Sequence, residues 1–219
     1  LKHGEASVEQ MLQNISAVQA SVDLASEVIF NLRDFLHDRR ARLAATDLGR
    51  MIDHATKMVQ LRPDSIKIRI VVDDDEVLLE QDPPLTVHVD RVQTTYVLIN
   101  LLVNAIEACT QAETAEPEVR IQLRLHSSKQ YIVLSVADNG PGLPAGDPET
   151  VFKRFFTTKK QGFGFGLAIC RDVIDRQRGK IHAQNNPIAG CTFTLTMLIE
   201  SDEAEEETIT MHHKTNQLR

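Results

Sequence analysis

The run VADNGPGLP, residues 136–144, places one carboxylate and two glycines directly after a predicted strand. Asp138 ends an apolar run, so we expect its carboxylate to be partly buried and able to accept a hydrogen bond from an amino group, such as the exocyclic amine of a purine. Gly140 and Gly142 have no Cβ atom, so a flat ring could approach the main chain there. A simple hairpin turn is the alternative, but residues 143–156 do not return as a strand.

Two amide side chains stand out in an apolar helical segment, NLLVNAIEA. Asn100 and Asn104 are four residues apart, so they share one face of the predicted helix. Amides on a mostly buried helix need hydrogen-bond partners, and an amide oxygen is also a suitable ligand for Mg²⁺. They are either structural amides that hold neighbouring loops or part of a metal site.

A third polar segment, TTKKQGFGFGLAIC at residues 157–170, has three alternating glycines before a predicted helix. Gly162, Gly164 and Gly166 would leave backbone N–H groups free at the helix N-terminus, where an anion is favoured. Lys159 or Lys160 could add a positive charge. A flexible linker is the alternative for this segment alone, since it matches neither of the common phosphate-loop patterns.

The three segments together predict more than each does separately. They offer an oxygen ligand for a metal, a carboxylate that can bind a purine base and a loop that can bind phosphates. These are the parts that are needed to hold Mg·ATP.

The surrounding chain alternates irregularly between predicted helices and strands, with a hairpin around Lys129 and Gln130. Helix 48–61 could be capped by Thr46 or Asp47, and Gly179 is expected to end the last helix. This order favours an α+β fold, a two-layer α/β sandwich with helices on one face of a mixed sheet. The predicted helices are 48–61, 91–111 and 166–179, and the predicted strands are 65–73, 85–90, 119–128, 131–139, 180–186 and 191–200.

Residues 6–40 predict one long helix, with apolar residues in a heptad pattern over nearly four repeats. Such a coiled-coil-like helix needs a partner, and we expect a second copy of the chain or a segment before residue 1; packing on its own domain is the alternative. We therefore divide the chain into a dimerisation helix at 1–46, a main domain at 47–199 and an acidic, solvated tail at 200–219.

The composition and charge of the chain argue against several classes of protein. The 219 residues carry a net charge of −7, which argues against nucleic acid as the main partner. We find no apolar run near the roughly 20 residues that span a bilayer and no secretory signal. Three distant cysteines show neither a metal spacing nor a disulfide framework, as expected in a reducing cytoplasm. The sequence begins with Leu1, so a membrane segment could lie in a longer parent protein.

Four ordered motifs resemble one known family. NLLVNAIEA, DNGPGLP, VFKRFFTTK and GFGFGLAI resemble the N, G1, F and G2 boxes of the ATP-binding domain of sensor histidine kinases, in the GHKL superfamily with its Bergerat-type fold. GCTFTLTML at 190–198 resembles the closing strand of that domain. The resemblance covers about residues 47–199, and the helix at 6–40 would correspond to the second helix of the dimerisation and phosphotransfer bundle.

The resemblance implies a role for each matching residue. Asn104 would bind Mg²⁺, with Asn100 near the phosphates or the metal, and Asp138 would bind the adenine amino group. The remaining nucleotide-binding positions would be Gly140 and Gly142 at the base, Thr192 near the adenine, Lys159 near the γ-phosphate, and Gly162, Gly164, Gly166 and Leu167 around the phosphates. Phe152, Phe155 and Phe156 would belong, with Lys159, to a mobile lid.

One position separates branches of this superfamily. Its ATPases have a Glu four residues before the metal-binding Asn, where it activates water as a general base. This chain has Asn100 there, and an amide cannot take a proton. We therefore expect ATP to be held without rapid hydrolysis, and its γ-phosphoryl group to be transferred to a nucleophile, with positioning and charge stabilisation supplying most of the catalysis.

The chain also departs from the family. The phosphoacceptor His, with its following acidic residue, is not found: the histidines outside the main domain, and His54 within it, do not fit the pattern. We identify no catalytic residue of this kind in the chain. Lys153 and Arg154 stand where the family often has an acidic residue and Pro.

The sequence thus predicts the cytoplasmic catalytic region of a two-component sensor histidine kinase, with ATP and Mg²⁺ as cofactors. It would form a homodimer through its N-terminal helix and have a response regulator receiver domain as its partner. Two alternatives remain at this point. One is a serine kinase of the mitochondrial type in the same superfamily, and the other is a nucleotide-binding or dimerisation module without catalysis.

Overall fold

A computed structural model describes residues 41–62, 69–74, 82–126, 130–159 and 162–199. The predicted helix at 6–40 and the predicted tail at 200–219 lie outside these residues, so both stay predictions. The division of the chain into three parts stays a prediction as well.

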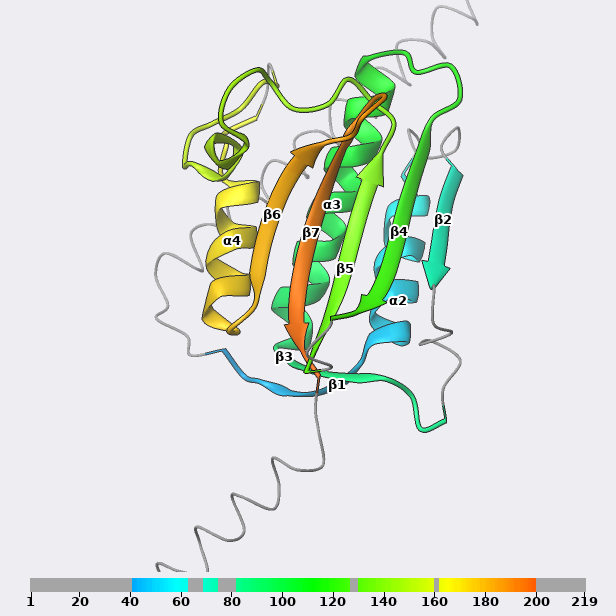
Figure 1. Cartoon of the computed structure of the whole chain (residues 1–219), viewed down its shortest axis with the longest axis vertical. Helices are drawn as coiled ribbons and strands as arrows, with labels where there is room; N and C mark the ends of the chain where they lie inside the picture. The colour runs from blue at the N-terminus through cyan, green and yellow to red at the C-terminus, as the bar shows by residue number, and fades with distance from the viewer. Residues whose placement is uncertain (1–40, 63–68, 75–81, 127–129, 160–161, 200–219) are drawn as a thin grey trace, which may run out of the picture. The chain divides into compact units, whose positions relative to one another are not determined.

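A five-stranded mixed sheet forms one layer of the fold (Figure 1). Its strand order is β2-β4-β5-β7-β6, in which β2 and β4 are parallel and the other neighbours are antiparallel. The mixed sheet and the hairpin of β4 and β5 are therefore confirmed. The strands are β2 Arg69–Asp74, β4 Glu118–Leu125, β5 Tyr131–Asp138, β6 Lys180–Asn185 and β7 Cys191–Leu198.

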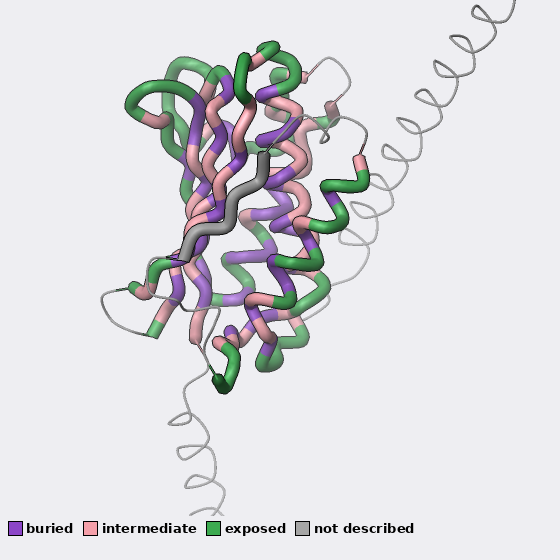
Figure 2. The backbone as a smooth tube through the Cα atoms, turned by 90° about the vertical axis from the view of Figure 1, so that its right-hand side faces the viewer, coloured by how far each residue is buried: buried purple, intermediate pink, exposed green. Residues whose placement is uncertain are grey.

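The central strands of the sheet bury one face only. In β5 and β7 every second residue is buried, as in Ile132, Leu134 and Val136 of β5. Alternate side chains of a strand point to opposite faces, so one face of the sheet contacts the core and the other is more accessible (Figure 2). Asp138 is in phase with the buried residues and therefore points to the core face.

Three helices cover the buried face of the sheet: α2 Leu48–Gln60, α3 Arg91–Gln111 and α4 Gly166–Arg176 (Figure 1). Asp47 caps α2, accepting from the backbone N–H of Arg50 at 3.0 Å. Asp90 caps α3 by accepting from the N–H groups of Val92 and Gln93, both at 3.1 Å. Side-chain caps satisfy N–H groups that have no acceptor within the helix, so these helices begin where the sequence predicts.

Helix α3 is long and apolar enough, by length and composition alone, to cross a membrane, with a mean hydropathy of 1.2. The expectation that no apolar run approaches this length was therefore wrong, because the amides and threonines of the helix do not offset its many Leu, Ile and Val residues. The helix packs on the sheet as part of the core. Its buried residues are Thr94, Val97, Leu98, Leu101, Leu102, Ala105, Ile106 and Cys109.

A short two-stranded ribbon, which the sequence did not predict as a unit, has one strand before α2 and the other directly before α3. Strand β1 Ala44–Asp47 pairs antiparallel with β3 Thr86–Val89, and Val87 forms a bridge to Ile199 beyond β7. The ribbon lies at the end of the sheet where β7 ends (Figure 1). It fixes the point from which α3 starts, because Asp90 follows β3 directly.

Helix α4 ends three residues earlier than Gly179, so that predicted boundary was wrong. The last helical residue is Arg176, and Arg178 takes a left-handed conformation with φ 61°. Gln177, which is buried, accepts from the backbone N–H of Asp90 at 2.7 Å and from the Thr94 hydroxyl at 3.0 Å. This contact holds the end of α4 against the start of α3.

Candidate functional site

One face of α3 brings the three predicted segments together. Asn100, Asn104 and Ala108 are spaced by four residues, so they follow one another along that face. A Cβ atom added at Gly166 would lie 2.7 Å from Asn100 Nδ2, and one at Gly140 would lie 3.3 Å from the backbone of Ala108. Lys159 contacts Asn104 between these two points. The start of α4, the lysine and the Asp138 turn therefore contact three successive turns of one helix.

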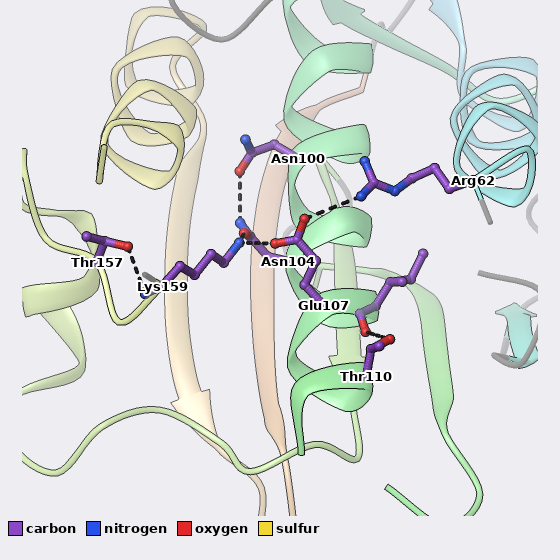
Figure 3. Close-up of polar contacts among 8 residues, drawn as sticks. Arg62, Asn100, Asn104, Glu107, Thr110, Thr157 and Lys159 are labelled. Atoms are coloured by element: carbon purple, nitrogen blue, oxygen red, sulfur yellow. Dashed lines mark hydrogen bonds and ion pairs between the residues drawn. The ribbon is translucent and has the colours of Figure 1, made fainter. Parts of the chain in front are cut away.

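A chain of polar contacts runs across this face (Figure 3). Asn104 Nδ2 donates to Asn100 Oδ1 at 2.9 Å, and Lys159 Nζ donates to Asn104 Oδ1 at 2.5 Å. The same ammonium lies 2.5 Å from Glu107 Oε2, while Glu107 Oε1 lies 3.4 Å from Arg62 Nη2. The amide of Asn104 thus directs its oxygen at a cation, which is the orientation that a metal ligand needs.

The carboxylate of Asp138 is 5% exposed and lies on the core side of β5. Oδ1 accepts from the backbone N–H of Gly140 at 2.9 Å, and Oδ2 accepts from Cys191 Sγ at 3.1 Å. Buried carboxylates need donors of this kind. These contacts fix the orientation of the carboxylate before any ligand is bound.

Two cysteines lie beside this carboxylate. Burial and then the charge of Asp138 raise the pKa of the Cys191 thiol, and the same two causes raise the pKa of Cys109. Both thiols are therefore neutral at pH 7, and neither is a nucleophile there, since the thiolate is the reactive form. Cys109, Cys170 and Cys191 are all buried free thiols.

Two glycines in left-handed conformations shape the turns around Asp138. At Gly142, with φ 82°, an added Cβ would lie 2.7 Å from Asn185 Oδ1. At Gly190, with φ 81°, it would lie 1.9 Å from the backbone oxygen of Asp138, a position that no side chain could occupy. The chain before β7 therefore passes directly over the end of β5.

The glycine-rich segment leads into α4 without a capping side chain among the described residues. The first backbone bond of the helix joins the N–H of Ile169 to Phe165 O at 2.9 Å, so the earlier N–H groups have no acceptor within the helix. Gly164, with φ 70°, accepts from the N–H of Phe155 at 2.9 Å. Gly162 and Leu167 lie on either side of this tight turn. An uncapped helix start of this kind suits an anion.

The phenylalanines before the glycines differ in their surroundings. Phe155 is 74% exposed and has a left-handed backbone conformation with φ 67°. Its ring contacts the ring of Phe165 edge-to-face, with the two ring centroids 4.8 Å apart. Phe152 is buried, packs edge-on against Phe193 at 6.1 Å and lies under the Arg171 guanidinium at 3.7 Å. Phe152 thus belongs to the core rather than to a mobile lid, because the 3-10 helix Pro148–Phe152 turns it inward.

Thr192 lies apart from the Asp138 carboxylate. It is in phase with the accessible face of β7, whereas its neighbour Cys191 is on the core face and contacts Asp138. The Thr192 hydroxyl donates to Asn186 Oδ1 at 2.6 Å, and Asn186 Nδ2 donates to the backbone oxygen of Asp138 at 2.9 Å. Thr192 therefore acts on Asp138 through Asn186, and not by direct contact with the carboxylate.

Sequence reasoning missed four residues of this arrangement: Glu107, Cys191, Asn186 and Gly190. Glu107 lies three residues after Asn104, on the same side of the helix, and its spacing could have indicated it. Gly190 directly precedes a strand, which is a common position for a left-handed residue. No signal in the sequence indicated Cys191 or Asn186, because both act across strand pairings.

The sequence profile of the family described as "Histidine kinase-, DNA gyrase B-, and HSP90-like ATPase" matches residues 89–201. The chain belongs to this family. The match begins at the end of β3 and runs past β7, so it contains α3, the Asp138 turn, the glycine-rich segment and α4.

Curated relatives of the chain are sensor kinases. It is 30% identical to the histidine-protein kinase AtoS of Escherichia coli over 84% of this chain and 29% of AtoS, and 30% identical to the sensor protein FixL of Bradyrhizobium diazoefficiens over 84% of this chain and 36% of FixL. Over 52% of its length it is 42% identical to the sensor protein KdpD of Escherichia coli, of which it covers 13%. The chain thus spans about a third or less of these relatives.

Solved structures of histidine kinases have the same fold. The catalytic domain of the histidine kinase ThkA superposes with a TM-score of 0.59 at 30% identity, covering 72% of this chain and 95% of that domain. ThkA in complex with the response regulator protein TrrA gives a TM-score of 0.64 at 24% identity, over 84% of this chain and 49% of that one. The recognition of the family, and of its two-layer fold, is confirmed.

Proposed function

We propose that this chain is the ATP-binding catalytic region of a two-component sensor histidine kinase. The observation that supports it most is the spacing along α3. Contacts at Asn100, Asn104 and Ala108 bring an uncapped helix start, a lysine and a buried carboxylate to one face of one helix. A nucleotide needs an anion site for its phosphates, a cation beside the γ-phosphate and an acceptor for the amino group of its base.

Asp138 would bind the adenine amino group. Its carboxylate already has a donor on each oxygen, Gly140 N and Cys191 Sγ, and a carboxylate oxygen accepts more than one hydrogen bond. Gly140 packs on α3, where a side chain would meet the backbone of Ala108 and Cys109 at 3.3 Å. Gly142 would keep the turn open for the base, while Thr192 would hold Asp138 through Asn186.

The phosphates would lie at the start of α4. Gly164, Gly166 and Leu167 would supply backbone N–H groups there, and the helix dipole favours negative charge. Gly162 would lie beside them, with its own N–H donating to Lys159 O at 3.4 Å. Lys159 would contact the γ-phosphate, because its ammonium is already on the same face of α3 as Asn100 and Asn104. Phe155 and Phe156 would be part of the segment that covers the nucleotide.

Asn104 would hold Mg²⁺, and the donor set fits this ion. Its amide oxygen contacts the Lys159 ammonium, which occupies the place of the metal ion in this structure. Amide oxygens are ordinary Mg²⁺ ligands when phosphates supply the other ligands. Asn100 orients this amide by accepting its Nδ2 hydrogen. A bound Mg²⁺ would neutralise charge on the β- and γ-phosphates during transfer.

Asn100 would favour transfer over hydrolysis, because an amide at that position cannot activate water. The phosphoacceptor His would come from outside this chain, and the phosphoryl group would pass to an Asp of a response regulator. The names of the relatives and the ThkA–TrrA complex support this role. Dimerisation through residues 6–40 and a cytoplasmic location are part of the same proposal.

Incubation with γ-labelled ATP tests the proposed reaction type. The chain should retain labelled ATP in the presence of Mg²⁺, and release of inorganic phosphate should be no faster than in an Asn104→Ala variant, which would lack the metal ligand. Sustained turnover well above that of the variant would assign an ATPase instead of a phosphotransfer domain.

A further inference from the structure

Lys159 forms two contacts with α3 that share one ammonium group. Its Nζ lies 2.5 Å from Asn104 Oδ1 and 2.5 Å from Glu107 Oε2 (Figure 3). Asn104 and Glu107 are three residues apart on the helix, so the ammonium bridges adjacent turns. Asn104 and Glu107 lie on the side of α3 that the proposed function assigns to the phosphates and the metal, and Lys159 reaches it from the segment before the glycines.

The ammonium and a metal ion would compete for the same oxygen. Mg²⁺ binds oxygen ligands at about 2.0–2.1 Å and keeps its other positions for waters and phosphates. An ammonium that contacts Asn104 Oδ1 at 2.5 Å fills the space that the ion would need. Two cations at one amide oxygen would also repel each other strongly. Lysine and metal are therefore alternative occupants of this oxygen.

Glu107 is the residue that favours the lysine. Its carboxylate is three-quarters buried and uses both oxygens, Oε2 for Lys159 and Oε1 for Arg62 at 3.4 Å. Arg62 follows α2, so the orientation of the carboxylate depends on a second element of the fold. A carboxylate between two cations is held in place and is a poor candidate for a ligand of a third.

We propose that Glu107 is a positioning residue that holds Lys159 on Asn104 in the nucleotide-free chain, so that Mg·ATP must displace the lysine. This inference rests on the proposed function. Displacement would free the ammonium for the γ-phosphate at the same moment as the metal takes the amide oxygen. Metal-free nucleotide would leave the lysine on Asn104, so the lysine would report which form of the nucleotide is bound.

Acetylation of lysines by an amine-reactive ester, read by mass spectrometry, tests the anchoring without any nucleotide. Glu107→Gln removes the charge but keeps the shape of the side chain. It should raise the labelling rate of Lys159 about two- to fivefold, the range for a partly exposed ion pair. Lys57, paired with Asp53 at 2.7 Å on α2, is an internal reference.

The matched control is Asp53→Asn, which breaks the lysine–carboxylate pair on α2 and should leave Lys159 unchanged. Equal labelling of Lys159 in the Glu107→Gln variant and the wild type would overturn the proposal. Because this arm needs no ATP, it is independent of the proposed function.

The second arm adds the ATP analogue AMPPNP to the wild-type chain, with and without Mg²⁺. Lys159 labelling should change with Mg·AMPPNP and stay close to the nucleotide-free rate with AMPPNP alone. Calorimetry on the Glu107→Gln variant should show that binding still depends on Mg²⁺. Loss of that dependence would make Glu107 a metal ligand and overturn its positioning role, whereas no binding of Mg·AMPPNP by the wild type would refute the proposed function itself.

Discussion

Asn100 and Gly166 are so close that a Cβ atom at Gly166 would lie 2.7 Å from Asn100 Nδ2. Asn100 is on α3 and Gly166 is the first residue of α4. The contact therefore places the uncapped start of one helix against the amide that orients Asn104 on the other. The geometry of the proposed phosphate site depends on this single approach.

Gly166→Ala should move the Asn100 side chain, because the atom that the new methyl group meets is the end of that side chain. The free energy of unfolding should fall by only about 1 kcal/mol, but the hydrogen bond from Asn104 to Asn100 would be lost. We expect Mg·AMPPNP to bind roughly tenfold more weakly, as measured by calorimetry. In an Asn100→Ala background the same substitution should cost much less, since contacting residues are not additive. Equal losses in both backgrounds would contradict the contact.

Asp138→Asn tests the residue that would bind the base. The amide can keep its oxygen on the N–H of Gly140, so we expect the thermal midpoint to shift by no more than a few degrees. Its NH₂ group would face the adenine amino group, and a charge-assisted hydrogen bond would be lost, which predicts binding weaker by about 10- to 100-fold. Unchanged AMPPNP affinity in a folded variant would refute this role for Asp138.

The wild-type chain should also discriminate against the guanine analogue GMPPNP. Guanine has a carbonyl oxygen where adenine has its amino group, and two acceptors facing each other in a buried site are unfavourable. Competition of GMPPNP against a labelled ATP analogue should show at least a tenfold weaker affinity. Equal competition by the two nucleotides would mean that Asp138 does not read the base.

Gly190→Ala should destabilise the fold severely. Its φ of 81° is unfavourable for Ala, and the added Cβ would lie 1.9 Å from the backbone oxygen of Asp138. We expect a loss of about 3 kcal/mol or more in the free energy of unfolding, measured with urea. Gly146→Ala is the control, because it has φ 121° but no atom within 4 Å of the added Cβ. It should cost only about 1 kcal/mol, and similar losses at the two sites would contradict the close approach.

The buried thiols make stability depend on pH in the alkaline range. Burial raises the pKa of Cys191 above the ordinary thiol value of 9.0. Above pH 9 the unfolded chain releases a proton that the folded chain retains, so the free energy of unfolding falls as pH rises, by up to about 1.4 kcal/mol per pH unit for each such thiol. Well below pH 9 the thiols are protonated in both the folded and the unfolded chain, so they do not make the free energy of unfolding depend on pH. Urea unfolding at pH 8, 9 and 10 should show a shallower decline in Cys191→Ser, and identical declines would refute this.

Helix α3 shows how much of the fold is predictable from the sequence. Its predicted bounds, 91–111, agree with the structure, in which Asp90 caps the start of the helix. The hairpin of β4 and β5 was predicted from two adjacent strand-like runs, and the antiparallel pairing confirms it. By contrast, β1 has four residues and pairs with β3 more than 35 positions away, and no local pattern indicates such a pairing. The predicted end of α4 was wrong because Arg178, and not Gly179, takes the left-handed conformation that follows the helix.

The candidate site was predictable where it depends on residue type and was not where it depends on packing. Asp138 and Asn104 stood out as polar side chains in apolar segments, and both lie where the helix and strand periods put them. The period of β7 alone does not say whether Thr192 or Cys191 faces Asp138, because that depends on the register with β5. The contact of Glu107 with Lys159 joins residues from two separate segments, and only the folded chain shows it.

Calorimetric titration of this chain with AMPPNP, with and without Mg²⁺, tests the central claim most directly. A nucleotide site along α3, with a metal at Asn104, predicts saturable binding of one nucleotide per chain that strengthens when Mg²⁺ is present. Absence of binding in a folded sample would contradict the claim, and binding of equal strength without Mg²⁺ would contradict the metal site at Asn104.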